Sequence, residues 1–358
     1  MFTIDPSVAA HYDAFWQRDC IDRFLVYLAV GKHPSKPPRP AGASDEEYIN
    51  LKWNDLDYRT QVSDLHHSTN TYYLDGFPVQ FINFGPGSLA ASIGGNYQLA
   101  LNTVWFDRNP IITDWDNPPA LEFDPESDLW KKTVALTDRI LQSGLAHTSV
   151  ADLGGTLDIL ASLRGTENLL YDMYDYPEEV KAATKRINAL WKHAYTLSVN
   201  RTAPYQEGTS SWMPVWCRQR YSPLQCDFSA MLSPDMFEEF VLPDLIDLTE
   251  FLDHSIYHMD GIGEIPHLDH LLSIPRLDAI QWTPGAGIGD PGDERWFEMY
   301  QRIQAAGKGL VLFVGKPDLV EPLIKSISPK GVFLSVGGCD HAASKEMEKM
   351  IKSYGLGR

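Results

Sequence analysis

Four apolar segments recur in the last third of the chain, and each ends at a glycine, a proline or a polar residue. They cover residues 255–257, 277–280, 309–314 and 331–336. The first three lead into helix-length stretches, and short strand-like runs spaced in this way are typical of βα units around a parallel sheet. Functional residues of such folds lie where the strands end. We therefore expect an α/β protein with a (β/α)8 TIM-type barrel and a polar rim.

The chain length of 358 residues fits one barrel with an extension. We expect residues 1–75 to form an N-terminal helical extension packed on the barrel, with residues 13–30 helix-like. Ser44 and Glu47 have the spacing of a capping box at a helix start. Residues 76–358 are expected to form the barrel, with early strands at 79–84, 148–151 and 210–215.

Bulk properties exclude some classes of partner. The formal net charge of −18 argues against nucleic acid and anionic membrane surfaces as partners. No apolar run approaches the roughly 20 residues of a membrane helix, and the N-terminus lacks the pattern of a signal peptide. The cysteines are too widely spaced for a disulfide framework, so a reducing cytoplasm is the expected location.

Polar residues two positions apart mark three of the expected strand ends. Side chains alternate along a strand, so the members of each pair face the same side. The pairs are Gln225 with Asp227, His258 with Asp260, and Gln281 with Thr283. Together with Cys339 they offer imidazole, carboxylate and thiolate groups, which suit Zn²⁺. The plainer alternatives are a buried His258 bonded to Asp260, Asp227 as a helix cap, and Cys339 as a small buried hydrophobe.

Other residues near the strand ends are candidates for contact with a substrate. Trp212, Trp216 and Trp282 have the aromatic character of a pocket wall, and core packing is the alternative. Lys316 follows the 309–314 strand, where it would neutralise an anionic substrate or remain a solvated loop residue. Asp152 and Asp158 are weaker candidates. The histidines at 267, 270 and 341 are expected on the surface or on helices.

Several motifs occur in an order and spacing that together are fairly specific. They are Leu163-Arg164-Gly165 followed by Pro177-Glu178-Glu179-Val180, the segment from Asp227 to Pro234, His258-Met259-Asp260-Gly261, and Val336-Gly337-Gly338-Cys339. In these motifs the chain resembles the uroporphyrinogen decarboxylase superfamily, and more closely its corrinoid-dependent methyltransferase branch. Asp260 stands where that family has the cysteine of an H-x-C motif. The arginine-rich N-terminal signature of the true decarboxylases is not found.

This resemblance implies a distorted (β/α)8 barrel that moves a methyl group between a small methylated substrate and a separate corrinoid protein. Carried over residue by residue, it makes His258, Asp260 and Cys339 the zinc ligands. Asp227, His258 and Asp260 are then the expected catalytic residues, with Gln225 and Gln281 lining the substrate site beside the aromatic residues and Lys316.

Three alternatives remain open. The same superfamily fold would support a metal-free decarboxylase or another lyase that uses Asp227, His258 and Asp260 for acid–base chemistry. An acidic barrel with tryptophan platforms is also compatible with a glycoside hydrolase, which requires two carboxylates at a defined separation. The replacement of the family cysteine by Asp260 is compatible with a non-catalytic binding subunit.

Overall fold

A seven-stranded sheet runs through the protein, and its strands come from both ends of the chain. In this computed structural model, residues 1–34, 36–106 and 110–354 are described. The strand order is β2-β1-β13-β12-β11-β10-β9. All neighbours are parallel except β1 and β2. Their bounds are β1 Leu25–Val30, β2 Thr71–Leu74, β9 Tyr221–Gln225, β10 His254–Asp260, β11 Ala279–Thr283, β12 Gly309–Val314 and β13 Val332–Val336.

Six short strands form three further pairs. The pairs are β3 Val79–Gln80 with β6 His147–Thr148, β4 Gln98–Leu99 with β5 Val104–Trp105, and β7 Thr209–Ser210 with β8 Trp216–Cys217. The first pair is parallel and the others are antiparallel. The expected α/β class with a parallel sheet is confirmed. Within the described residues, the strand ladders do not join into one closed barrel.

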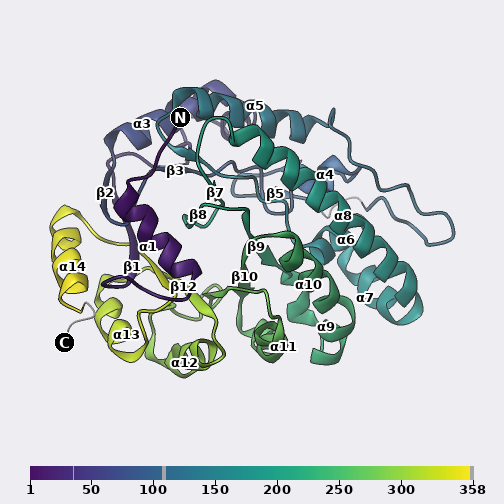
Figure 1. Cartoon of the computed structure of the whole chain (residues 1–358). Helices are drawn as coiled ribbons and strands as arrows, with labels where there is room; N and C mark the ends of the chain where they lie inside the picture. The colour runs from purple at the N-terminus through teal and green to yellow at the C-terminus, as the bar shows by residue number, and fades with distance from the viewer. Residues whose placement is uncertain (35, 107–109, 355–358) are drawn as a thin grey trace.

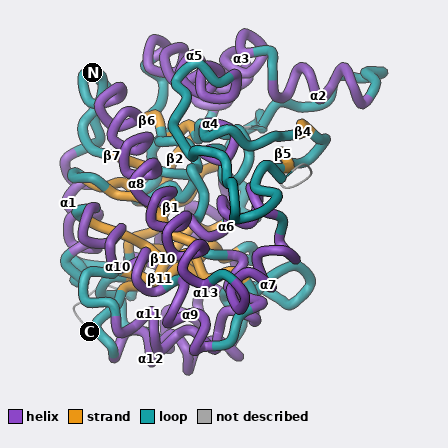
Figure 2. The backbone as a smooth tube through the Cα atoms, turned by 90° about the vertical axis from the view of Figure 1, so that its right-hand side faces the viewer, coloured by secondary structure: helices purple, strands orange, loops and turns teal. Residues whose placement is uncertain are grey.

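Helices surround this sheet, as Figures 1 and 2 show. Helices α10 to α13 lie on the outer side of β9–β12, and α14 lies beside β1 and β2 (Figure 1). The bounds are α1 Pro6–Trp16, α2 Asp45–Trp53, α3 Leu56–Thr69, α4 Leu89–Ser92, α5 Asp128–Ser143, α6 Thr156–Arg164, α7 Thr166–Asp175, α8 Pro177–Thr202, α9 Pro234–Phe240, α10 Leu242–Phe251, α11 Leu268–Ser273, α12 Phe297–Ala305, α13 Val320–Ser326 and α14 His341–Ser353.

Alternating side chains on the strands build two separate cores. Residues such as Met259, Trp282 and Leu312 join the large core that also contains the surrounding helices. Their neighbours on the other face, including Ile256 and Val311, join a second core with side chains of α1. Burial of both faces explains why β12 reads as a continuous apolar run rather than as an alternating one. The second core lies on the face that also carries His258.

The N-terminal region differs from the expected helical extension. The segment 13–30 is not one helix, because α1 ends at Trp16 and Leu25–Val30 forms β1. β1 pairs in parallel with β13, some 300 positions further along the chain, and local pattern does not carry that information. Residues 1–75 therefore contribute two strands to the main sheet as well as helices. Residues 355–358 of the expected barrel segment lie outside the described residues.

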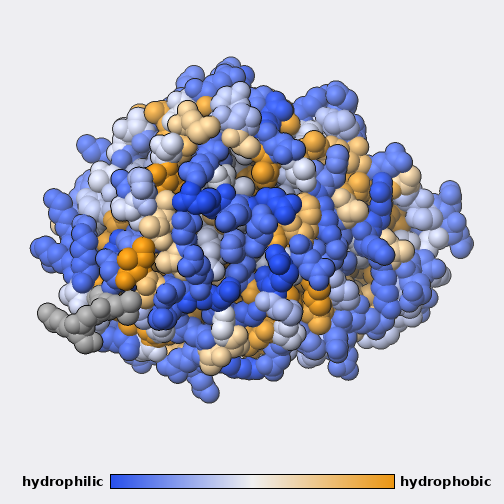
Figure 3. Space-filling view, in the orientation of Figure 1, coloured by the Kyte–Doolittle hydropathy of each residue, from blue (hydrophilic) through white to orange (hydrophobic). Residues whose placement is uncertain are grey.

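The capping box predicted from Ser44 and Glu47 is confirmed. Ser44 and Glu47 form the expected capping box at the start of α2, in which Glu47 N donates to Ser44 Oγ at 3.2 Å and Ser44 N donates to Glu47 Oε2 at 2.7 Å. The face shown in Figure 3 is covered mainly by hydrophilic residues, in keeping with the charge of −18. Among the described residues, no helix combines the length and apolar character needed to cross a membrane.

Candidate active site

Polar side chains form two rows across β9, β10 and β11. In the strand register, His258 lies between Gln225 on β9 and Gln281 on β11. One step further along, Asp260 lies beside Thr283. These positions share the face of Ile256, and they follow the apolar part of each strand. The strand alternation expected from the sequence therefore brings the three pairs to one site.

The imidazole of His258 is held by its neighbours. Gln281 donates its amide hydrogens to Trp282 O at 3.0 Å and Thr283 Oγ1 at 2.9 Å, which fixes the orientation of the amide. Its amide oxygen then accepts from His258 Nδ1. A proton on Nδ1 leaves the lone pair on Nε2, which lies 3.8 Å from Asp260 Oδ2. The Trp212 ring meets the imidazole edge-on, with 4.9 Å between centroids.

Asp227 completes a three-residue group with His258 and Asp260. It begins the short 3₁₀ turn Asp227–Met231 directly after β9, and one ligand atom from each residue lies within 4.8 Å of the others. The Asp227 side chain is open to solvent at the cleft but is enclosed by protein on its other sides. This partial desolvation raises the pKa of its carboxyl group, His258 opposes the shift, and Asp260 adds to it.

Further carboxyl groups surround Asp227. Asp158, on α6, accepts hydrogen bonds from the backbone N–H of Asp227 at 3.1 Å and of Phe228 at 2.8 Å. Burial, followed by the charge of Asp227, raises the pKa of Asp158 to about 7. Burial likewise raises the pKa of Asp152 to about 7 and that of Glu264 to about 9. Glu264 is fully buried and accepts from Tyr257 Oη at 3.0 Å.

The raised pKa values show that these neighbouring carboxyl groups resist ionisation, and a bound cation would stabilise their charged forms. Glu264 was not among the candidates from sequence. Its position in the sequence follows no strand alternation, because the turn after β10 brings Glu264 close to Asp227. Asp158 had been noted as a weak candidate, and its role as an acceptor for the Asp227 backbone depends on tertiary contact.

Close approach between loops makes this arrangement possible. A Cβ at Gly155 would lie 2.2 Å from Gln225 O and 2.4 Å from Asp158 Oδ2, so only glycine fits there. This contact holds the end of β9 against the start of α6, where Asp158 lies. A cavity of about 320 Å³ opens beside it, lined by Asp158, Gln225 and Asp227 together with apolar residues that include Phe106 and Met231.

The remaining predicted residues are divided between the site and the core. Trp212 contacts His258, whereas Trp216 and Trp282 are fully buried and away from the cleft. Trp282 follows Gln281 on the same strand and must face the opposite side, where it packs on Trp296. Trp216 lies in the second core, and its indole donates to Glu207 O at 2.9 Å. The structure thus corrects the expected placement of these two tryptophans on a pocket wall.

Lys316 and Cys339 lie at other strand ends. Lys316 is solvent-exposed in the loop after β12. Cys339 follows β13 and is half-buried against the large core, where burial raises its thiol pKa. It is not part of the Asp227–His258–Asp260 group found among the described residues, and β11 and β12 lie between β13 and β10 in the sheet. His267, expected on the surface or on a helix, ends the 3₁₀ helix Ile262–His267 and is buried against Phe237.

Comparison with known proteins adds evidence on the fold. No protein-family model and no curated protein matches the chain. Among solved structures, a methyltransferase from Methanosarcina mazei matches with a TM-score of 0.60, covering 99% of this chain and 98% of that chain. The two proteins share a fold. Their sequence identity is 11%, so the likeness concerns the fold, and the chemistry must be argued from the residues described above.

Proposed function

We propose that this protein is a methyltransferase that moves a methyl group between a small methylated substrate and a separate corrinoid protein, with zinc at the Asp227–His258–Asp260 group. The observation that carries the proposal is this group of three potential ligands at the strand ends, within a fold shared with a methyltransferase. The motif resemblance of the sequence supports the corrinoid partner. On the same grounds we propose that the fold is a distorted (β/α)8 barrel.

Hydrogen bonds around the short strands favour the barrel. Ser149 N donates to Gln80 O at 3.0 Å, and Val150 N donates to Ser210 O at 3.0 Å. These bonds extend the β3–β6 pair towards β7, while Tyr221 N at the start of β9 donates to Thr209 Oγ1 at 3.0 Å. The short pairs thereby approach the edge of the main sheet. We infer that these strands occupy the part of the ring between β2 and β9, the two edge strands of the main sheet.

The residues of the group fit a zinc ion chemically. Imidazole nitrogen and carboxylate oxygen are both ordinary zinc ligands. The Gln281 amide oxygen accepts from Nδ1, which directs the Nε2 lone pair of His258 towards the carboxylates. Hydrogen-bond partners of metal-bound histidines commonly orient the ring in this way. The surrounding carboxyl groups favour a divalent cation. Our ligand set therefore replaces the expected Cys339 with Asp227.

When bound, zinc would supply a Lewis acid that polarises a substrate oxygen or lowers the pKa of a bound thiol or water. The protein itself would orient His258 through Gln281 and shield one side of the imidazole with Trp212. Asp158 would hold the backbone that carries Asp227. The cavity beside Asp227 provides space for a small substrate at the group.

Metal content and methyl transfer test this function together. We expect about one zinc per chain after purification without chelator, and loss of zinc and of methyl transfer to a corrinoid in His258→Ala. Asp227→Asn should weaken zinc binding, because it removes one charged ligand. Asp235→Asn, an exposed acid on the nearby helix α9, serves as the control and should keep both properties. The proposal would be contradicted if the purified parent protein contained no metal and the His258→Ala variant kept full methyl transfer.

A metal-free lyase is the second candidate, and the raised pKa of Asp227 favours it. A carboxyl group whose pKa lies closer to neutrality is better suited to proton transfer. Lyase activity that survives complete removal of metal by chelation, but is lost in Asp227→Asn, would assign this second function.

A further inference from the structure

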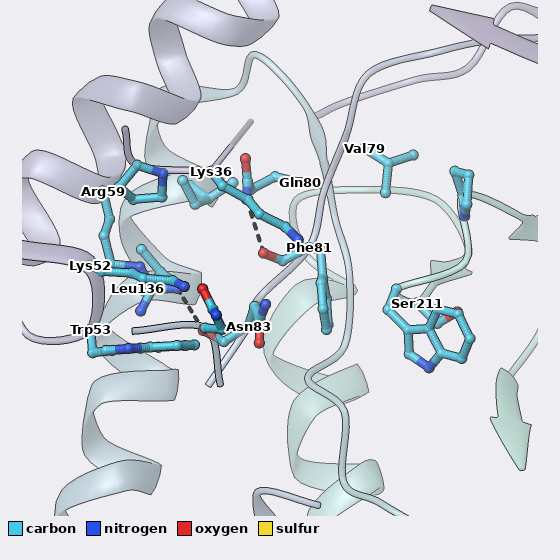
Figure 4. A pocket seen from close by; sticks show the side chains of 15 residues that line it. Lys36, Lys52, Trp53, Arg59, Val79, Gln80, Phe81, Asn83, Leu136 and Ser211 are labelled. Atoms are coloured by element: carbon cyan, nitrogen blue, oxygen red, sulfur yellow. Dashed lines mark hydrogen bonds between the residues drawn. The ribbon is translucent and has the colours of Figure 1, made fainter. Parts of the chain in front are cut away.

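A second cavity lies next to the candidate site, and none of its lining residues belongs to the Asp227–His258–Asp260 group. Its volume is about 280 Å³. Figure 4 shows Lys52, Trp53 and Arg59 on one side, Phe81 in the middle and Ser211 on the other side. The cavity thus runs from α2 and α3, past the segment after β3, to the segment after β7.

The charge of this cavity is opposite to that of the whole protein. Lys36, Lys52 and Arg59 line it, and among the described residues no aspartate or glutamate does so. The protein as a whole carries a charge of −18. Three cations around one small cavity repel one another, and an anionic ligand would offset that repulsion.

Arg59 is a buried cation, and no carboxylate pairs with it in the part of the chain that the structure describes. It is 9% exposed, its guanidinium lies over the Phe84 ring at 4.3 Å, and its Nη2 donates to Asn83 O at 2.7 Å. Its Nη1 is buried and has no hydrogen-bond partner among the described residues. Desolvation lowers the pKa of Arg59. An unpaired buried charge and an unused donor are both costly to stability, and a bound anion would offset that cost.

Lys52 extends the cationic wall of the cavity. Its Nζ donates to Leu101 O at 2.5 Å and lies 4.8 Å from the Trp53 ring. Burial lowers its pKa, and the nearby charges of Lys36 and Arg59 lower it further. The ammonium group of Lys52 has three N–H donors, and the carbonyl and the ring use only some of them. Lys52 is therefore free to bind an oxyanion together with Arg59.

The opposite end of the cavity is apolar and borders the candidate site. Trp212 lines this end, and its ring contacts the His258 imidazole. The indole Nε1 of Trp212 is buried without a hydrogen-bond partner among the described residues. A ligand that fills the cavity would therefore meet cationic groups at one end and an aromatic wall at the other.

We propose that this cavity binds a small organic anion, whose carboxylate or phosphate group is held by Arg59 and Lys52 and whose apolar body extends past Phe81 towards Trp212. The proposal goes beyond the function proposed above and does not depend on it, because the cavity and the metal group share no residue. Carboxylate and phosphate both match the donors of an arginine and a lysine, and the experiment distinguishes them.

Isothermal titration calorimetry with three related probes tests the proposal. Benzoate and phenyl phosphate carry the two oxyanions, and benzamide is the neutral control of similar shape. We expect at least one anion to bind at millimolar concentration or below, and benzamide to bind at least about tenfold more weakly, since hydrogen bonds to charged groups contribute about 1.5–3 kcal/mol. A preference for benzoate would assign a carboxylate ligand, and a preference for phenyl phosphate would assign a phosphate ligand.

Substitutions locate the binding. Lys52→Gln and Arg59→Gln should each raise the Kd of the bound anion about tenfold, whereas Arg59→Lys should retain part of the affinity. Lys349→Gln, on the surface of α14, is the control and should leave the Kd unchanged. Lys52 is less buried than Arg59, so its variant keeps the test decisive if Arg59→Gln fails to fold. Equal binding of benzamide, no binding of either anion, or an unchanged Kd in Lys52→Gln would overturn the proposal.

Discussion

At the scale of single residues, the position of a side chain along a strand decides between function and packing. Gln281 orients His258, while its neighbour Trp282 is wholly buried on the other face. Met259, between His258 and Asp260, is likewise buried in the large core. The period of two along a strand is therefore a stronger guide to site residues than the aromatic or polar character of a residue alone.

His147 on β6 should make stability depend on pH. It is fully buried, its Nδ1 lies 2.8 Å from Ser210 Oγ and its Nε2 lies 3.1 Å from Glu207 O. Burial lowers its pKa from 6.5 to about 4. The unfolded chain therefore binds the proton first, and this group's stabilisation, roughly 3 kcal/mol, is present above pH 6.5 and is lost as the pH falls towards 4.

Denaturant unfolding at several pH values measures this effect. In His147→Gln the free energy of unfolding should fall less steeply between pH 6.5 and pH 4 than in the parent protein. His193→Gln, which removes an exposed histidine on α8, should leave the slope as it was. An equal slope in the parent and in His147→Gln would show that His147 is not the group responsible.

At the scale of elements, the site depends on loops that approach one another more closely than side chains allow. The end of β9 lies against the start of α6 at Gly155. Replacing Gly155 with alanine should destabilise the protein by about 2–3 kcal/mol, because its Cβ would overlap Gln225 O and Asp158 Oδ2. The same change should displace Asp158 and weaken metal binding at Asp227.

Gly144 provides the matched control for this prediction. It ends α5 with a φ of +65°, and a Cβ there would meet no atom within 4 Å. Gly144→Ala should cost only about 1 kcal/mol, the price of a left-handed conformation, and should leave the site intact. Thermal unfolding and zinc affinity, measured for both variants, separate the effect of backbone strain at Gly144 from the effect of steric overlap at Gly155. Equal losses in the two variants would argue against the close contact at Gly155.

At the scale of the whole molecule, one buried carboxylate joins the N-terminal region to the sheet. Asp75 is fully buried and accepts from Arg23 Nη1 at 2.5 Å, Arg23 Nη2 at 2.9 Å and Val26 N at 2.9 Å. His11 Nδ1, on α1, lies 2.5 Å from its Oδ1. These bonds connect α1, β1 and the turn after β2. We therefore expect the region before residue 76 to unfold together with the rest of the sheet.

Asp75→Asn should lower the free energy of unfolding by about 3–5 kcal/mol, because it leaves the Arg23 guanidinium without its charged partner. Circular dichroism and tryptophan fluorescence should report one coincident transition in both proteins. Glu122→Gln, at an exposed acid outside this cluster, should change stability by no more than about 0.5 kcal/mol. Two separate transitions, or a loss below 1 kcal/mol in Asp75→Asn, would contradict this cooperativity.

The local sequence pattern was sufficient to predict the strands β10 to β13, the capping box at Ser44 and the placement of His258 and Asp260 on one face of a strand. Each of these depends on neighbouring residues, through side-chain period, caps and apolar runs. Three other features required the folded chain: β1 beside β13, Asp158 and Glu264 around Asp227, and Arg59 buried over Phe84 in its cavity. Each joins segments far apart in sequence, and only packing determines which distant groups share a low-dielectric space.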